Sequence, residues 1–284
     1  MKTTVIYHRA DFDGIFCREI AKKFLPEAEL IGWDYGDPLV QATGQVYVLD
    51  LSPACRAISH LREQSLIWID HHKSSIDAFP PDLAGYRIDG VAACRLAWQW
   101  FSRDHTDPVV QYNGLPSKEE FTGRTVIEPW AVRLAGEYDI WDKRDPDAEL
   151  FQHGLRSCDV NFDLLLEDNT EYVQFLLENG RALQYAKTKE NESIIKAQGF
   201  TVKWEGQTFL VCNHARFDSH LFTAGIKPEH TALLGFSFNG KQYKVSLYHC
   251  PGHEDQDLSL IAVKYNGGGH RGACGFACDK LPFI

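Results

Sequence analysis

Short apolar, β-branched segments that alternate with helical segments constrain the fold of this chain more than any other feature. The expected strands are Thr4–Tyr7, Glu29–Trp33, Gln45–Leu49 and Ser65–Ile69, and the expected helices are Gly14–Phe24, Pro53–Gln64 and Val91–Phe101. Strands and helices in this order are typical of a parallel sheet covered by helices on both faces. The N-terminal region is therefore predicted to be an α/β domain.

A long helical segment, Glu171–Gln198, separates this region from one in which strand patterns dominate. Beyond it the expected elements are strands at Thr201–Trp204, Thr208–Cys212, Ala232–Asn239 and Gln242–Tyr248, a hairpin turn at Asn239-Gly240 and a helix at Leu258–Tyr265. A chain of 284 residues fits two domains of roughly 100–180 residues each. The predicted boundaries are 1–165 for the first domain, 166–198 for a helical connector and 199–284 for a smaller α/β domain.

Two segments before the connector differ in pattern. Asp104–Thr125 breaks the alternation with Pro, Gly and charged residues in no clear period, which indicates a surface excursion with room for a short helix. Helical spacing resumes at Pro129–Tyr138.

The net charge of −10 disfavours a clamp for long nucleic acid, because such proteins neutralise phosphates with a basic face. Short phosphate ligands remain compatible, since bound divalent cations can supply local positive charge. None of the eight cysteines forms a C-x-x-C pair, which disfavours a zinc ribbon. The N-terminal apolar run is too short for a signal peptide or membrane span, so we expect a cytoplasmic protein with reduced thiols and no membrane partner.

Acids and histidines directly follow three of the expected strands. They are His8, Asp11 and Asp13 after the first strand, Asp50 after the third, and Asp70, His71 and His72 after the fourth. Helix capping explains any one of these clusters. The carboxyl ends of parallel strands, however, meet at one edge of a sheet, where such folds bind ligands. Three clusters at that edge predict a shared site for divalent cations.

Two further motifs carry polar groups. Glu137–Asp142 offers another acid, either Asp139 or Asp142, although solvated acids at a helix end also explain it. Near the C-terminus, three glycines precede His270 and Arg271. Consecutive glycines allow backbone N–H groups to approach an anion closely, and the two side chains after them are donors for a phosphate or a base. This interpretation is favoured over a flexible loop.

Together these motifs resemble the DHH phosphoesterase superfamily. The resemblance is carried by His8-x-x-Asp11-x-Asp13, Asp50, Asp70-His71-His72 and the segment Gly267-Gly268-Gly269-His270, which is similar to the signature of the DHH-associated C-terminal domain. The motifs follow the family's order over nearly the whole chain. Tyr138-Asp139-Ile140-Trp141 is more similar to the nanoRNase branch, which hydrolyses short oligoribonucleotides and cyclic nucleotides.

The resemblance implies a centre of two divalent ions, usually manganese, with the active site in a cleft between a DHH domain and a DHH-associated domain. It implies that one ion is held by His8, Asp11 and Asp50, and the other by Asp13, Asp50, His71 and Asp139. Asp50 would then bridge the two ions. The choice of Asp139 over Asp142 rests on the resemblance.

The resemblance also implies roles around the ions. Asp70, His71 and His72 would be catalytic, with Asp70 orienting a ligating imidazole and His72 facing the phosphate or supporting the cluster. Substrate would be bound by Gly268, Gly269, His270 and Arg271. Imidazole and carboxylate ligands favour manganese over magnesium and leave zinc and cobalt open.

We therefore expect a manganese-dependent phosphodiesterase that hydrolyses short oligoribonucleotides or linear and cyclic dinucleotides with metal-activated water. One alternative is a RecJ-like exonuclease on single-stranded DNA, which the acidic charge disfavours. A second is a pyrophosphatase or polyphosphatase, which needs more Lys and Arg around its anion. A third, a non-catalytic nucleotide sensor, requires an incomplete ligand set. The oligomeric state stays open, with a homodimer among the alternatives.

Overall fold

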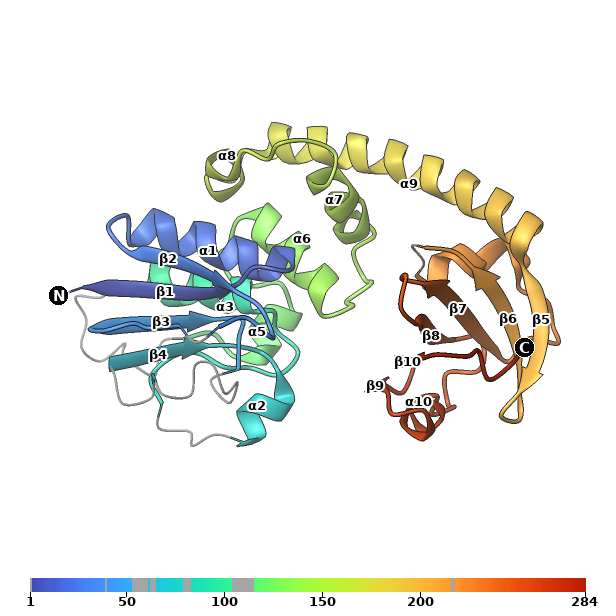
Figure 1. The fold of residues 1–284 in the computed structure, drawn as a ribbon. Coiled ribbons are helices and arrows are strands. Elements are labelled where there is room, and N and C mark those ends of the chain that lie inside the picture. The colour runs from blue at the N-terminus through green and yellow to red at the C-terminus, as the bar shows by residue number, and fades with distance from the viewer. Residues whose placement is uncertain are drawn as a thin grey trace. The chain divides into compact units, whose positions relative to one another are not determined.

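The computed structural model describes residues 2–38, 40–52, 61, 65–78, 83–103, 115–215 and 218–284. The chain divides into two compact units, residues 1–183 and 184–284 (Figure 1). The division falls inside α9 (Thr170–Gln198), the long helix that the sequence predicts as a connector.

The first unit contains a parallel four-stranded sheet with the strand order β2-β1-β3-β4. The strands are β1 (Thr3–His8), β2 (Glu29–Trp33), β3 (Gln45–Leu49) and β4 (Ser65–Ile69), and the last three have the predicted bounds. After β2 on one side of β1, the chain crosses to β3 on the other side. This reversal makes the carboxyl ends of β1 and β3 the topological switch point, where α/β sheets bind ligands.

Neighbouring residues of each strand enter different hydrophobic cores, because both faces of the sheet are covered. In β1, Val5 packs in the core that contains residues of α1 (Phe12–Phe24) and α3 (Ala93–Ser102). The next residue, Ile6, packs on the opposite face with Val48 and Trp68. Continuous apolar strands of this kind are typical of parallel sheets.

The remaining helices of the first unit are short, apart from α6. They are α2 (Lys73–Ala78), α5 (Lys118–Thr122), α6 (Trp130–Asp139), α7 (Asp147–Leu155) and α8 (Phe162–Leu166). The predicted helix Pro53–Gln64 lies outside the described residues except for Leu61. The predicted excursion does carry a short helix, α5, which begins with a capping box between Ser117 and Glu120. Its residues 104–114 are outside the described part.

The second unit contains a mixed six-stranded sheet with the order β5-β6-β7-β8-β10-β9. Its elements are β5 (Phe200–Trp204), β6 (Gln207–Asn213), η2 (Ser219–Gly225), β7 (Ala232–Phe238), β8 (Tyr243–His249), α10 (Ser259–Lys264), β9 (Gly268–His270) and β10 (Ala273–Cys278). The β7–β8 hairpin turns at Asn239-Gly240 as predicted, with Gly240 at a φ of 92°.

None of the described helices is both long enough and apolar enough to cross a membrane.

Candidate metal centre

The carboxyl ends of β1, β3 and β4 bring their acidic and histidine side chains together. His8 ends β1, Asp50 follows β3, and Asp70 follows β4. Three overlapping groups have potential ligand atoms within 4.8 Å of one another: His8, Asp11 and Asp50; Asp13, His71 and Asp139; and Asp50, Asp70, His71 and His72. Every residue that the sequence proposes as a metal ligand therefore lies in one connected cluster.

The first group forms where β1 runs into α1. His8 Nδ1 lies 2.8 Å from Asp11 Oδ2 and 3.4 Å from Asp50 Oδ2. Asp11 is also the N-cap of α1, because its Oδ1 accepts a hydrogen bond from the Gly14 amide at 3.0 Å. A Cβ at Gly14 would lie 1.9 Å from the His8 carbonyl oxygen, so only glycine lets α1 begin so close to the strand end.

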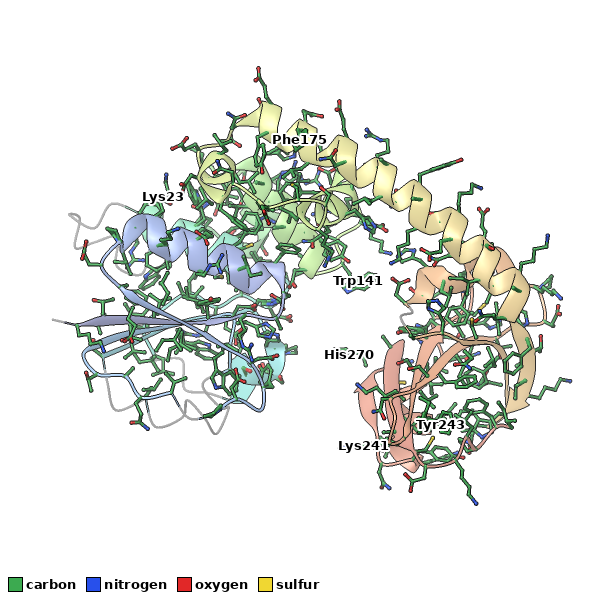
Figure 2. The ribbon with its side chains drawn as sticks, turned by 45° about the horizontal axis from the view of Figure 1, so that its top comes forward. Lys23, Trp141, Phe175, Lys241, Tyr243 and His270 are labelled. Carbon is green, nitrogen blue, oxygen red and sulfur yellow. The ribbon has the colours of Figure 1, made fainter. Side chains whose placement is uncertain are left out.

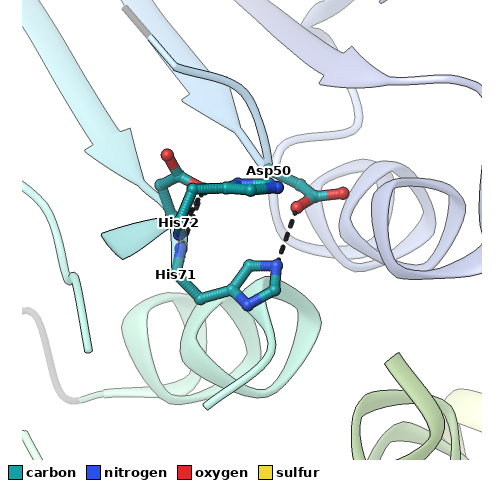
Figure 3. Close-up of side chains that lie close together, drawn as sticks. Asp50, His71 and His72 are labelled. Carbon is teal, nitrogen blue, oxygen red and sulfur yellow. Dashed lines mark hydrogen bonds and ion pairs between the residues drawn. The ribbon is translucent and has the colours of Figure 1, made fainter. Parts of the chain in front are cut away.

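The second group surrounds His71. Its Nε2 lies 3.3 Å from Asp139 Oδ2, 3.4 Å from Asp50 Oδ1 and 3.6 Å from Asp13 Oδ2. Figure 3 shows the His71 ring directed at Asp50. Three carboxylates around one imidazole leave an excess of negative charge, which is the environment of a hard or borderline cation.

Asp50 joins the two groups. Its Oδ2 faces His8 and its Oδ1 faces His71, yet neither buried oxygen accepts a hydrogen bond from the described residues. Buried carboxylate oxygens are costly without partners, and a pair of cations would satisfy both. Asp50 also has a φ of 57°, in the left-handed region, where a non-glycine residue is uncommon and often functional. The residues present thus fit a bimetal centre.

Asp13 also caps helix α3, which its position in the sequence does not reveal. Its two oxygens accept hydrogen bonds from the Ala93 and Cys94 amides at 2.9 and 2.7 Å, at the N-terminus of α3. The positive end of a helix dipole stabilises a carboxylate there and fixes its direction. Asp13 is therefore held rigidly beside His71.

Asp70 orients His72. Asp70 Oδ1 lies 2.6 Å from His72 Nδ1 and also accepts a hydrogen bond from the His71 amide at 2.8 Å. The buried Oδ2 has no hydrogen-bond partner among the described residues. The carboxylate thus fixes the ring of His72, while His71 faces the other acids. The imidazole that Asp70 orients is that of His72.

The electrostatics of the cluster favour bound protons when no cation is present. The neighbouring carboxylates of Asp11 and Asp50 raise the pKa of His8 to about 10. Burial opposes the charged form of His71, but Asp50 and the other acids outweigh it and raise its pKa to about 10. Burial raises the pKa of Asp13 and of Asp139 to about 7, reinforced by neighbouring carboxylates. Cations that bind here displace these protons.

Of the two acids in the fourth motif, Asp139 lies in the cluster. Asp142 instead pairs with Arg144, whose Nε lies 2.8 Å from Asp142 Oδ1. The guanidinium holds the pKa of Asp142 below its ordinary value. Its charge is already balanced, which leaves Asp139 as the available ligand.

Asp34 is a residue that the sequence analysis overlooked. It directly follows β2, and its Oδ1 lies 3.5 Å from His8 Nε2, on the opposite side of the ring from Asp11. The other acids were predicted because they follow the carboxyl ends of parallel strands, and Asp34 has the same position after β2. Asp34 faces His8 at a longer distance than the 2.6 Å between Asp70 and His72, and can orient the ring more weakly.

The glycine-rich motif forms β9 and the turn to β10 in the second unit. A Cβ at Gly269, where φ is 131°, would lie 2.6 Å from the Cys274 Cα, so this glycine is needed for the strands to pair. Gly268 and His270 are exposed, and Arg271 donates a hydrogen bond to the Asp255 carbonyl at 2.6 Å. The substrate contacts of this motif remain a prediction.

Comparisons with solved structures decide the fold. A DHH domain from a member of a family of ribosomal proteins is 15% identical over 96% of this chain and 82% of its own, with a TM-score of 0.55. The chain shares the fold of this DHH domain. A pGpG-specific phosphodiesterase from Vibrio cholerae is 13% identical over 98% of this chain and 94% of its own, with a TM-score of 0.52.

A third structure with this fold is an exopolyphosphatase-related protein from Bacteroides fragilis. It is 12% identical over 99% of this chain and 88% of its own, with a TM-score of 0.50. No family model and no curated protein matches the sequence. The DHH fold is thus shared at identities too low to transfer an activity.

Proposed function

We propose that this DHH-fold protein is a metal-dependent phosphodiesterase that hydrolyses short oligoribonucleotides or linear and cyclic dinucleotides. The observation that carries the proposal is the pair of ligand groups joined by Asp50, whose two buried oxygens face His8 and His71 but accept no hydrogen bond from the described residues. Paired cation sites that share a carboxylate are typical of enzymes that cleave phosphoesters.

His8, Asp11 and Asp50 would hold one ion, and Asp13, Asp50, His71 and Asp139 the other. Bound divalent cations supply positive charge for the phosphoryl oxygens and make water nucleophilic near neutral pH. Mixed imidazole and carboxylate donors favour Mn²⁺ over Mg²⁺. The ligand set thus supports manganese as the resident ion.

Side chains of the protein position the metal ligands and orient His72 at this site. Asp13, fixed by the amides of α3, and Asp50, fixed by its backbone conformation, hold their oxygens in place before any ion arrives. Asp70 keeps one side of the His72 ring engaged at Nδ1, which leaves Nε2 to bind or protonate a phosphoryl oxygen. In this role, hydrogen bonding to Asp70 raises the pKa of His72 and favours its proton-donating form.

Three observations support a short nucleotide substrate. The net charge of −10 disfavours long nucleic acid. The fold is shared with a phosphodiesterase named for pGpG. His270 and Arg271, expected to contact the substrate, offer too few positive charges for a polyphosphate chain.

A substrate panel tests the proposal. The Mn²⁺-loaded protein is incubated with pGpG, cyclic dinucleotides, RNA of 2–5 and of 20 nucleotides, and pyrophosphate, and the products are identified by mass spectrometry. We expect mononucleotide products from the short phosphodiesters. If pyrophosphate is the one substrate hydrolysed, the protein is a pyrophosphatase and the proposal is wrong. If the 20-nucleotide strand is cleaved processively, the protein is an exonuclease and the proposal is again wrong.

A further inference from the structure

The first unit exposes its aromatic side chains mainly beside the metal centre. Among its described residues, the exposed large aromatics are Tyr35, Tyr138, Trp141 and Phe175. Tyr35 directly follows Asp34, Tyr138 directly precedes Asp139, and Trp141 is two residues beyond it. Singly exposed rings are ordinary, but three of these four lie within two residues of an acid at the cluster, and gathered exposed rings are typical of a site for a flat, apolar ligand.

Trp141 is the largest and most exposed of these rings, with 67% of its surface accessible. Its backbone φ is 56°, a left-handed conformation that is rare for a bulky residue. The turn is fixed at the end of α6, because the Trp141 amide donates a hydrogen bond to the Tyr138 carbonyl at 3.1 Å. Strained backbone that displays an apolar ring is typical of a binding site.

A cation lies over the same ring. Lys143 Nζ is 4.8 Å from the centroid of the Trp141 ring, in a cation–π contact. No aromatic ring among the described residues stacks on Trp141. Figure 2 labels Trp141 at the loop beyond α6. Trp141 lies two residues beyond Asp139, so its ring and the charge of Lys143 belong to the loop that directly follows a residue of the metal cluster.

We infer that Trp141 is a stacking platform for a nucleobase, with the phosphate of the same nucleotide at the metal centre. The inference rests on the proposed function and narrows it to substrates that carry a base next to the scissile phosphate. Bases of every kind stack on aromatic rings, so this contact would select nucleotides over polyphosphates without selecting a sequence. Trp141 is then a specificity-determining residue.

Binding of two product-like probes tests the platform. Isothermal titration gives the affinities of Mn²⁺-loaded protein for guanosine 5′-monophosphate and for inorganic phosphate. In Trp141→Ala, the mononucleotide should bind about fivefold to a hundredfold more weakly, the range expected for loss of one base–aromatic stack. Phosphate affinity should not change. Trp141→Phe should restore most of the mononucleotide affinity, because a smaller ring still stacks.

Phe175→Ala is the matched control, because Phe175 is an exposed aromatic of α9 far along the chain from the cluster, and it should bind both probes like the wild type. The inference is overturned if Trp141→Ala binds the mononucleotide normally, or loses affinity for phosphate to the same extent. The two proposals can fail separately. If Trp141→Ala loses base-dependent binding while the wild type cleaves no phosphodiester, the stacking role of Trp141 is supported and the proposed hydrolytic activity is contradicted.

Discussion

Two acid-rich regions lie close together along α6, and they balance their charge in opposite ways. At its end, Asp139 joins Asp13, Asp50 and His71, where acids outnumber bases and burial raises the pKa of the acids. Half a turn earlier, the fully buried Glu137 accepts two hydrogen bonds from Arg124, both of 2.8 Å.

The charges of the Glu137 region are paired within the chain. Arg133 lies 3.3 Å from Glu137 and 2.8 Å from Asp145, so each acid faces a guanidinium. The Asp50 region has no guanidinium among the described residues, and its central carboxylate is without a hydrogen bond from them. The contrast teaches that the chain balances the charge of the first region with guanidiniums, whereas the second region keeps an excess of acids over imidazoles that bound cations can neutralise.

The largest effect is expected from Asp50→Asn. Loss of the shared charge should lower Mn²⁺-dependent phosphodiester hydrolysis by about a thousandfold or more, since both ions lose a ligand. In metal-free protein the pKa values of His8 and His71 should fall, because Asp50 is a carboxylate that faces both rings. Asparagine also tolerates the left-handed backbone.

A turnover assay and an NMR titration of the imidazoles measure both effects of Asp50→Asn. Asp77→Asn, at an exposed acid paired with Lys73, is the control and should change neither. Unchanged turnover in Asp50→Asn would contradict the role of this residue.

Glu137→Gln should lower the stability of the fold, because Glu137 lies in the region whose charges are paired within the chain. Removal of the buried charge leaves Arg124 without its carboxylate partner and Arg133 with Asp145 alone, which should lower the free energy of unfolding by about 3 kcal/mol. Urea denaturation measures this loss. Glu192→Gln, at an exposed pair with Lys189, should change stability by less than about 0.5 kcal/mol. Equal stability of Glu137→Gln and wild type would show that the two regions do not differ as described.

Metal affinity should rise steeply with pH. The pKa values of His8 and His71 are raised to about 10 and those of Asp13 and Asp139 to about 7, so the metal-free cluster holds protons at neutral pH. Each proton that a cation displaces makes affinity increase about tenfold per pH unit. Titration calorimetry at pH 6, 7 and 8 in several buffers measures both affinity and proton release. An affinity for Mn²⁺ that does not change with pH, with no protons released on binding, would contradict proton displacement.

The smallest effect is expected from Asp34→Asn. Loss of the acid that faces His8 Nε2 should weaken Mn²⁺ binding by about tenfold, the lower end for residues that orient a ligand. Equilibrium dialysis measures the affinity, and Asp77→Asn again serves as the control. A change in unfolding free energy without a change in affinity would assign Asp34 to the fold alone.

The sequence predicted most of the sheet because its strands are continuous apolar runs that end in polar residues. The bounds of β2, β3 and β4 were right residue for residue. Strand ends also located His8, Asp50 and Asp70, since parallel topology brings those ends together. Asp34 was missed although it follows β2 directly, as Asp50 follows β3.

Contacts between distant residues could not be predicted in this way. Asp13 accepts hydrogen bonds from amides at Ala93 and Cys94, 80 and 81 positions away, and no local pattern reveals such a cap. The pairing of Arg124 with Glu137 likewise joins the turn after α5 to α6, 13 positions away. Helices α7 and α8 went unrecognised because both are short, and only tertiary packing stabilises them.

Anomalous diffraction at the manganese absorption edge, on crystals soaked in Mn²⁺, is the most direct test of a bimetal centre. The proposal predicts two peaks in the first unit, one bounded by His8 and Asp11 and one by His71 and Asp139, with Asp50 between them. A single peak elsewhere, or none at saturating Mn²⁺, would contradict it.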